Sequence, residues 1–270
     1  MENPWLRRYA VLVAVCTALL IITGPAVSSN EVRPLYSLGQ SHAWLGATVT
    51  TLMAGLVIWL TRLKERVGLR RLAYAALGAN IVQDLLGFDP VPAPMRISHA
   101  LLGFFFFSTT VAIAVFVSKG WMQNPKPVEN GSLPRFLVMT IPSLVLFQVT
   151  LGVAFRHGVM SGLPHILGAL VVAAFLGPAM ALILRNQHTE VRSAGIALTL
   201  CASLQILLGF TLLIILAMDP LVVIVATTAH AAMGAFTLAA AAVVAMRMRR
   251  VIWAGAARET EESPSSFSPD

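Results

Sequence analysis

The chain has 270 residues, of which 57% are hydrophobic and 11% charged, and its formal net charge is +7. This composition excludes an ordinary water-soluble domain, because several apolar runs approach or exceed about 18 residues, the length needed to cross a bilayer. The positive charge does not indicate nucleic-acid binding, since the basic residues are scattered among short loops rather than gathered in a patch with aromatic residues. We therefore predict an integral membrane protein that contacts membrane lipid and binds no nucleic acid.

In chain order, the apolar runs predict eight membrane-spanning helices at 9–27, 40–61, 72–88, 95–118, 136–155, 162–184, 193–217 and 222–246. The first run follows two arginines, as a secretory signal does, but its apolar part is long for a signal and it completes a regular series of helix pairs. We expect two homologous four-helix bundles, 1–124 and 136–250, joined by a proline-containing linker at 125–135. The polar, acidic end at 251–270 is predicted to be a disordered cytoplasmic tail.

Basic residues are distributed unequally between the two ends of these helices. Eight spans place both termini on one side, and 16 of the 19 lysines and arginines fall on that side. The other side carries only Arg33, Arg96 and Arg156. Because cytoplasmic loops of membrane proteins are enriched in lysine and arginine, we expect both termini to be cytoplasmic in a bacterial-type plasma membrane.

A helix pair is repeated along the chain. In the last three pairs the first helix carries glutamine with glycine four residues later, at Gln83/Gly87, Gln148/Gly152 and Gln205/Gly209. The second helix of all four pairs carries a histidine near its outer end, at His42, His99, His165 and His230, with a nearby glycine at Gly46, Gly103, Gly168 and Gly234. One such histidine would be explained by helix packing. Four at similar depth indicate a shared role as ligands.

The ligand count favours haem over zinc or copper. Each half offers two histidines and no cysteine or carboxylate that completes a tetrahedral set, whereas a porphyrin supplies four nitrogens and needs only axial ligands. We therefore predict two bis-histidine haem sites. The outer arginines Arg33, Arg96 and Arg156 are candidates to pair with haem propionates, although each is also compatible with a solvated loop position.

Three segments, 147–172, 98–104 and 227–236, resemble the haem A synthase family of cytochrome oxidase assembly proteins. The resemblance covers about residues 9–247. It implies two homologous four-helix halves and oxidation of a haem O methyl group to a formyl group. It further implies that His165 and His230 bind haem b and that His42 and His99 bracket the substrate, haem O. The implied partners are haem O synthase and the cytochrome oxidase assembly machinery.

The chain departs from the family pattern around the first histidine. Many members have glutamate where this chain has Gly39 and arginine where it has Ala43. Glu31, the only outer-loop carboxylate before His42, is the candidate catalytic acid or base, and a solvated loop glutamate is its alternative. Two other functions stay open: a non-catalytic haem-binding assembly factor and a b-type electron-transfer cytochrome. The latter normally places haems at both membrane faces.

Overall fold

The structure is a computed structural model that describes residues 3–28, 36–63, 66–87, 92–122, 134–215 and 217–262. Within these ranges all regular secondary structure is helical. The helices are α1 (Pro4–Ser28), α2 (Tyr36–Thr61), α3 (Val67–Leu86), α4 (Ala93–Phe116), α5 (Lys119–Met122), α6 (Leu137–Arg156), α7 (Gly162–Leu184), α8 (Thr189–Ile215) and α9 (Pro220–Glu262). The prediction of an all-α protein is confirmed.

Seven of the described helices, all except α3 and the four-residue α5, are long and apolar enough to cross a membrane. Their outward-facing side chains are also apolar: Met139 is 70% exposed and Ile214 80% exposed. Leaving such side chains in water would be unfavourable, whereas lipid tails solvate them. The chain is therefore a multi-pass membrane protein whose outer surface contacts lipid.

Helix α3 differs from the others in composition. It has 20 residues, enough to span the hydrocarbon layer, but it contains Arg70, Arg71 and Asp84. Its polar side chains Asn80 and Gln83 are 0% and 4% exposed, so they face neighbouring helices and not the exterior.

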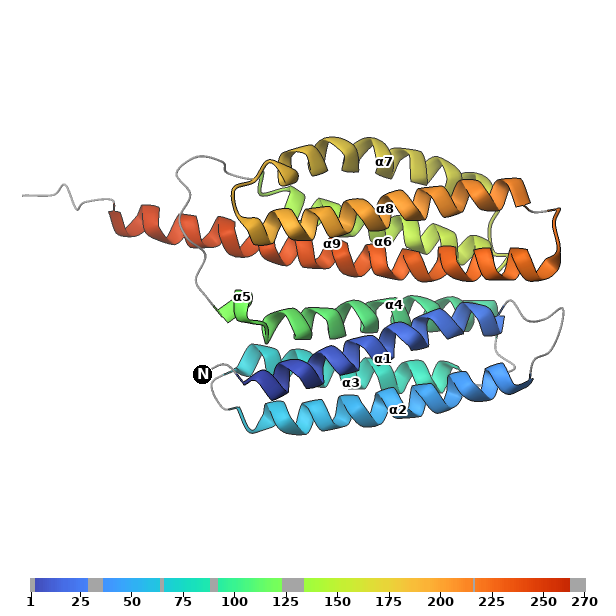
Figure 1. The fold of residues 1–270 in the computed structure, drawn as a ribbon, viewed down its shortest axis with the longest axis horizontal. Coiled ribbons are helices and arrows are strands. Elements are labelled where there is room, and N and C mark those ends of the chain that lie inside the picture. The colour runs from blue at the N-terminus through green and yellow to red at the C-terminus, as the bar shows by residue number, and fades with distance from the viewer. Residues whose placement is uncertain are drawn as a thin grey trace, which may run out of the picture.

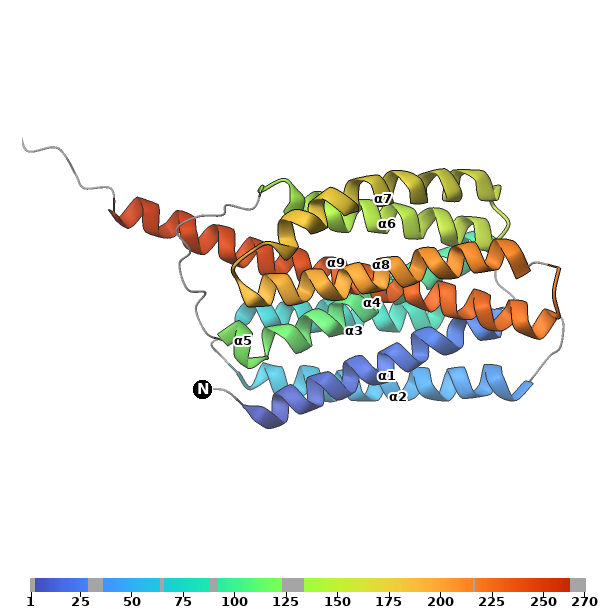
Figure 2. The ribbon, with the colours of Figure 1, turned by 45° about the horizontal axis from the view of Figure 1, so that its top comes forward.

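The helices form two groups that lie side by side in Figure 1, and in the turned view of Figure 2 α8 and α9 overlap α3 and α4. In one group α1 contacts α2, α2 contacts α3, α3 contacts α4, and α4 returns to α1. In the other group α6, α7, α8 and α9 make the same closed series of contacts. The groups meet mainly where α1 and α4 pack on α9, and the rings of Phe107 and Phe236 cross this boundary with their centres 5.1 Å apart.

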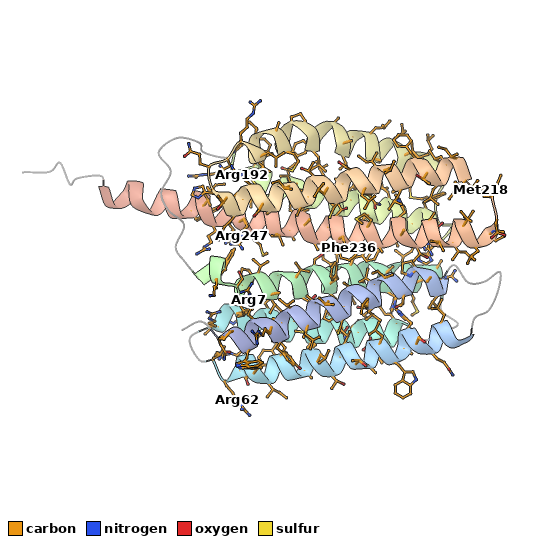
Figure 3. All side chains as sticks on the ribbon, in the orientation of Figure 1. Arg7, Arg62, Arg192, Met218, Phe236 and Arg247 are labelled. Carbon is orange, nitrogen blue, oxygen red and sulfur yellow. The ribbon has the colours of Figure 1, made fainter. Side chains whose placement is uncertain are left out.

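The two ends of the helix array differ in charge. Arg7, Arg62, Arg192 and Arg247 all lie at the end that carries the N-terminus, whereas Met218 lies at the opposite end (Figure 3). The histidine-bearing segments of α2, α4, α7 and α9 all begin at that opposite end (Figure 1). The separation of basic loops from histidines expected from the sequence is therefore present.

Most predicted boundaries agree with the structure within a few residues, and the span 162–184 coincides with α7. The clearest difference is α9, which continues to Glu262 through part of the segment predicted to be disordered. Just before this segment α9 carries Arg247, Arg249 and Arg250, whose long side chains suit the end of a membrane helix. Residues 263–270 and most of the predicted linker 125–135 lie outside the described residues.

Candidate functional site

The α6–α7 pair shows how the chain brings a histidine against a glycine. At the end of α6, Val159 N–H donates to the carbonyl of Ala154 and Gly158 N–H to that of Phe155, each at 3.0 Å. Gly158 has φ +71°, the left-handed conformation that such a helix end requires and that glycine adopts at low cost. This turn returns the chain, so that α7 runs antiparallel to α6 with His165 beside Gly152.

His165 lies directly on Gly152 of α6. The Cβ that alanine would add at Gly152 would be 2.9 Å from Cε1 of His165. One turn earlier on α6, Gln148 donates from Nε2 to the His165 carbonyl at 2.8 Å and to Nδ1 of its ring at 3.0 Å. Gln148 also lies over Gly168, where an added Cβ would be 2.5 Å from Oε1. Two glycines therefore receive the side chains of the opposite helix.

We call this arrangement the crossed glycine contact. The histidine of the second helix contacts a glycine of the first helix. In return, the residue one turn before that glycine contacts a glycine of the second helix. The α8–α9 pair repeats it. An added Cβ at Gly209 would be 3.2 Å from Cε1 of His230, and one at Gly234 would be 3.5 Å from Nε2 of Gln205. The Gln205 Nε2 group lies 3.3 Å from Nε2 of His230.

The α3–α4 pair has the same contact. An added Cβ at Gly87 would be 3.1 Å from Cε1 of His99, and one at Gly103 would be 3.0 Å from Nε2 of Gln83. Here the histidine bonds to the backbone and not to the glutamine side chain, because Nδ1 of His99 donates to the carbonyl oxygen of Gln83 at 2.9 Å.

The α1–α2 pair completes the series, although the sequence pattern did not reveal it. An added Cβ at Gly24 would be 3.3 Å from Cε1 of His42, and one at Gly46 would be 4.0 Å from Cδ1 of Leu20. Leucine thus occupies the place of the glutamine. The Leu20–Gly24 spacing is the signal that a search anchored on glutamine misses. Thr23 supplies the polar contact instead, with Oγ1 2.8 Å from Nδ1 of His42.

Two of the four histidines face each other across the second helix group. The ring centres of His165 and His230 are 6.1 Å apart, and the rings are nearly perpendicular at 85°. Several buried polar atoms beside them have no hydrogen-bond partner: Oε1 of Gln148, Oε1 of Gln205 and Nδ1 of His230. Unsatisfied buried polar atoms are uncommon in proteins, and three around one histidine pair mark this place as a candidate ligand site.

The first helix group has a polar cluster beside its histidines. Oδ2 of Asp84 accepts hydrogen bonds from Oγ1 of Thr50 at 2.8 Å and from Nδ2 of Asn80 at 3.3 Å. These bonds tie α3 to α2, as expected for a polar helix clasp. A Cβ added at Gly46, one turn after His42, would be 3.9 Å from Oδ1 of Asp84.

The predicted propionate-binding arginines are placed unequally. Arg96 lies in the first turn of α4, three residues before His99. Arg156 ends α6 and joins the two groups, since its Nη2 donates to the carbonyl of Pro25 at 2.8 Å and to Oγ of Ser28 at 3.0 Å. Glu31 and Arg33 lie outside the described residues.

The other histidines and the cysteines lie apart from these contacts. His157 caps the end of α6, and His188 precedes α8 at the basic end, where burial lowers its pKa and Glu190 partly offsets the change. Cys16 and Cys201 are free thiols on α1 and α8. In the part of the chain that the structure describes, no three or more histidine, cysteine, aspartate or glutamate side chains gather as metal ligands.

Comparison with known proteins adds no relative: no protein-family model matches the sequence, and no curated protein is significantly similar to it.

Proposed function

We propose that this protein is a haem-binding membrane oxidoreductase similar to haem A synthase, which converts haem O to haem A for cytochrome oxidase maturation. The observation that carries the proposal is the fourfold crossed glycine contact, which presents a histidine at the same end of each helix pair. A packing role would require close approach of helices, but not an imidazole at all four positions.

The pair His165–His230 fits a haem held by two axial ligands. Two imidazoles that bind one iron ion from opposite sides have ring centres about 6 Å apart, since each metal–nitrogen bond is about 2 Å long. The observed separation is 6.1 Å. We assign these two residues to haem b, with Arg156 as the nearest candidate for a propionate contact.

Hydrogen bonding around the His230 ring fits ligation after rotation of one amide, whereas Nδ1 of His165 accepts from the Gln148 amide. A ligating histidine usually donates its second ring N–H to an oxygen atom, which fixes the lone pair on the metal-facing nitrogen. Rotating the Gln205 amide by half a turn would turn its oxygen toward Nε2 of His230 and leave the partnerless Nδ1 as the ligating nitrogen. Oε1 of Gln205, which now has no hydrogen-bond partner, would then accept from Nε2 of His230.

In the first helix group, His99 already donates from Nδ1 to the Gln83 carbonyl, which leaves the Nε2 lone pair for a metal. The Thr23 hydroxyl donates to the carbonyl of Leu20 at 3.0 Å, so its oxygen accepts from Nδ1 of His42. Both histidines are thus oriented as Nε2 ligands, and we propose that they hold the substrate haem O. Oxidation of the methyl group would need iron chemistry together with an oxidant and an electron source from outside this chain, while the protein binds and orients the haem. Glu31 stays a candidate acid or base.

The membrane arrangement follows from the same features. We propose that α3 is an eighth span, because it lies between α2 and α4 and its polar side chains face inward. The eight spans would then form two homologous four-helix halves. We further propose that the basic end is cytoplasmic and the histidine end external in a bacterial-type plasma membrane. Haem O synthase and the oxidase assembly machinery are the proposed partners.

Extraction and chromatography of haems tests the activity. Cells that make haem O, but have no haem A synthase of their own, should accumulate haem A when they express the wild-type chain. They should not do so with His42→Ala or His99→Ala. Wild-type protein that binds haem but yields no haem A would overturn the proposed oxidation.

The second candidate is a non-catalytic haem-binding assembly factor. It is favoured by Gly39 and Ala43, which stand where many haem A synthases have glutamate and arginine. In the structure nothing lies within 4 Å of a Cβ placed at Gly39. Haem binding without oxidation in the same experiment would select this function. A b-type electron carrier is less well supported, because all four histidines lie toward one end of the helices.

A further inference from the structure

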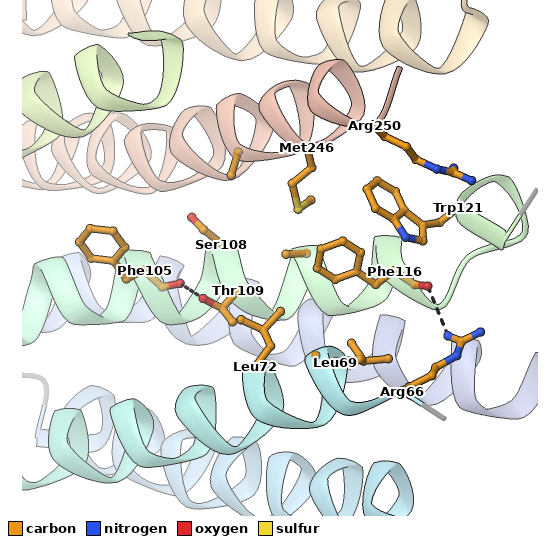
Figure 4. Close-up of a pocket in the computed structure, with 13 residues that line it drawn as sticks. Arg66, Leu69, Leu72, Phe105, Ser108, Thr109, Phe116, Trp121, Met246 and Arg250 are labelled. Carbon is orange, nitrogen blue, oxygen red and sulfur yellow. Dashed lines mark hydrogen bonds between the residues drawn. The ribbon is translucent and has the colours of Figure 1, made fainter. Parts of the chain in front are cut away.

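A groove opens at the basic end of the molecule, opposite the end that carries His42, His99, His165 and His230. It has a volume of about 940 Å3 and runs between α3, α4 and α9, with α5 at its mouth (Figure 4). It therefore follows the boundary between the two helix groups, where α4 faces α9.

The mouth of the groove is cationic and aromatic. Arg66 donates from Nη1 to the carbonyl of Phe116 at 3.5 Å, and Arg250 donates from Nη1 to that of Gly120 at 2.9 Å. The Arg250 guanidinium stacks over the Trp121 ring at 4.8 Å, and Arg247 approaches the same ring at 5.4 Å. Glu190 forms an ion pair with Arg247 and a longer one, at 4.0 Å, with Arg250. Among the described residues at the mouth, three arginines and one glutamate give a net positive charge.

The interior of the groove is apolar and opened by small residues. A small residue lines the groove on each of three helices: Gly68 on α3, Ala112 on α4 and Ala242 on α9. Nothing lies within 4 Å of a Cβ placed at Gly68. Along α4 the lining extends from Phe116 to Phe105, about 16 Å at 1.5 Å per residue. A mostly apolar groove of this length suits a hydrocarbon chain.

We propose that this groove binds an anionic phospholipid, with its phosphate at Arg66 and Arg250, its glycerol region beside Trp121, and one acyl chain along α4. The charge at the mouth selects the occupant. Basic pockets between membrane helices on the cytoplasmic side favour anionic headgroups, and tryptophan is enriched at the interfacial depth. A soluble anion would gain nothing from the apolar interior, and a zwitterionic lipid would gain less from the arginines. The proposal is independent of haem binding.

Quenching of Trp121 fluorescence by lipids brominated on the acyl chain tests the site. The chain has five tryptophans, so the emission of Trp121 is taken as the difference between wild type and Trp121→Phe, both as full-length protein in mixed micelles. The mole fraction of brominated phosphatidylglycerol that quenches half of this emission should be about fivefold lower than that of brominated phosphatidylcholine. A factor of about five is expected for one arginine near an anionic lipid surface. Equal half-quenching by the two lipids would overturn the proposal.

Variants locate the effect. Arg66→Gln should raise the phosphatidylglycerol requirement toward that of phosphatidylcholine. The matched control Arg62→Gln, at the same end but not in the groove lining, should leave it unchanged. Ala242→Phe should fill the groove and abolish saturable quenching by either lipid. An unchanged lipid preference in Arg66→Gln would contradict the placement of the phosphate at Arg66. If a variant does not fold, the difference between the two lipids in the wild-type protein still decides the proposal.

Discussion

The two helix groups share one backbone register but surround their histidines with different chemistry. In α6–α9, the side-chain amides of Gln148 and Gln205 contact the imidazoles. In α1–α4, the histidines bond to oxygen atoms instead, His99 to a carbonyl and His42 to the Thr23 hydroxyl. In both groups the glycines determine where each histidine lies, and the neighbouring polar groups determine which ring nitrogen carries the proton.

A carboxylate also distinguishes the groups. Asp84 is held by Thr50 and Asn80 inside the first group, whereas Glu190 and Asp219 of the second group lie toward helix ends. Ionisable residues within membrane spans are costly and usually functional. Asp84 is therefore a polar feature of the first group, the one that we propose acts on the substrate haem, whereas we propose that the second group holds haem b.

The largest expected effect separates the two groups. His42→Ala and His99→Ala should each abolish haem A formation, because each removes one proposed ligand of the substrate haem. The b-type absorbance from the second group should stay largely intact. Haem chromatography and absorbance of the same preparation measure both properties. Loss of the b-type spectrum in either variant would show that the groups do not act separately.

A large effect is expected at the glycine beneath His165. Gly152→Ala would place Cβ 2.9 Å from the ring, so the ring must shift, at a cost of about 1–3 kcal/mol in stability. Bound haem should decrease together with the unfolding temperature. Gly177→Ala, on α7 of the same group with nothing within 4 Å of the new Cβ, is the control. Equal haem content in the two variants would refute the crossed glycine contact as the device that positions the ligand.

A smaller effect is expected from Asp84→Asn. The change replaces the side chain that accepts hydrogen bonds from Thr50 and Asn80, and leaving a buried hydrogen-bonding group without its partner costs about 1–3 kcal/mol. Haem A formation should fall and the unfolding temperature decrease, while the b-type spectrum stays unchanged. Asp219→Asn, in the loop before α9, serves as the control. A change in the b-type spectrum of Asp84→Asn would contradict the separation between the groups.

The smallest effect concerns a histidine outside the four pairs. Burial lowers the pKa of His188 in the folded protein, so the unfolded chain binds the proton more readily. The resulting stability is present above the unfolded pKa of about 6.5 and is lost as pH falls below it. His188→Gln should therefore lose less stability than wild type between neutral and mildly acidic pH, as measured by thermal unfolding at each pH. A steeper loss in the variant would contradict the sign.

Much of the fold was accessible from the sequence, because apolar length alone specifies membrane helices. The end of α9 at Glu262 could not be predicted from the sequence, because the polar residues after Val251 have a composition that also suits disorder. The apolar run 72–88 was predicted as a span and forms most of α3, but α3 is not among the seven described helices apolar enough to cross a membrane, and its polar Asn80 and Gln83 are buried against neighbouring helices.

The site was only partly predictable. Glutamine spacing located three of the four glycines beneath the histidines, but Gly24 was missed because Leu20 replaces the glutamine there. The link from Arg156 to Pro25 was also not predictable, since it joins segments 131 residues apart. The groove at the basic end depends on how α3, α4 and α9 meet, which no local pattern records.

The most direct test of the central claim is the absorbance spectrum of the purified protein from haem-replete cells. Wild type should show a low-spin b-type spectrum, because His165 and His230 provide two axial ligands. His165→Ala or His230→Ala should remove it, and His188→Ala should not. A colourless wild-type protein, or a spectrum unchanged in both His165→Ala and His230→Ala, would contradict the claim that this histidine pair holds a haem.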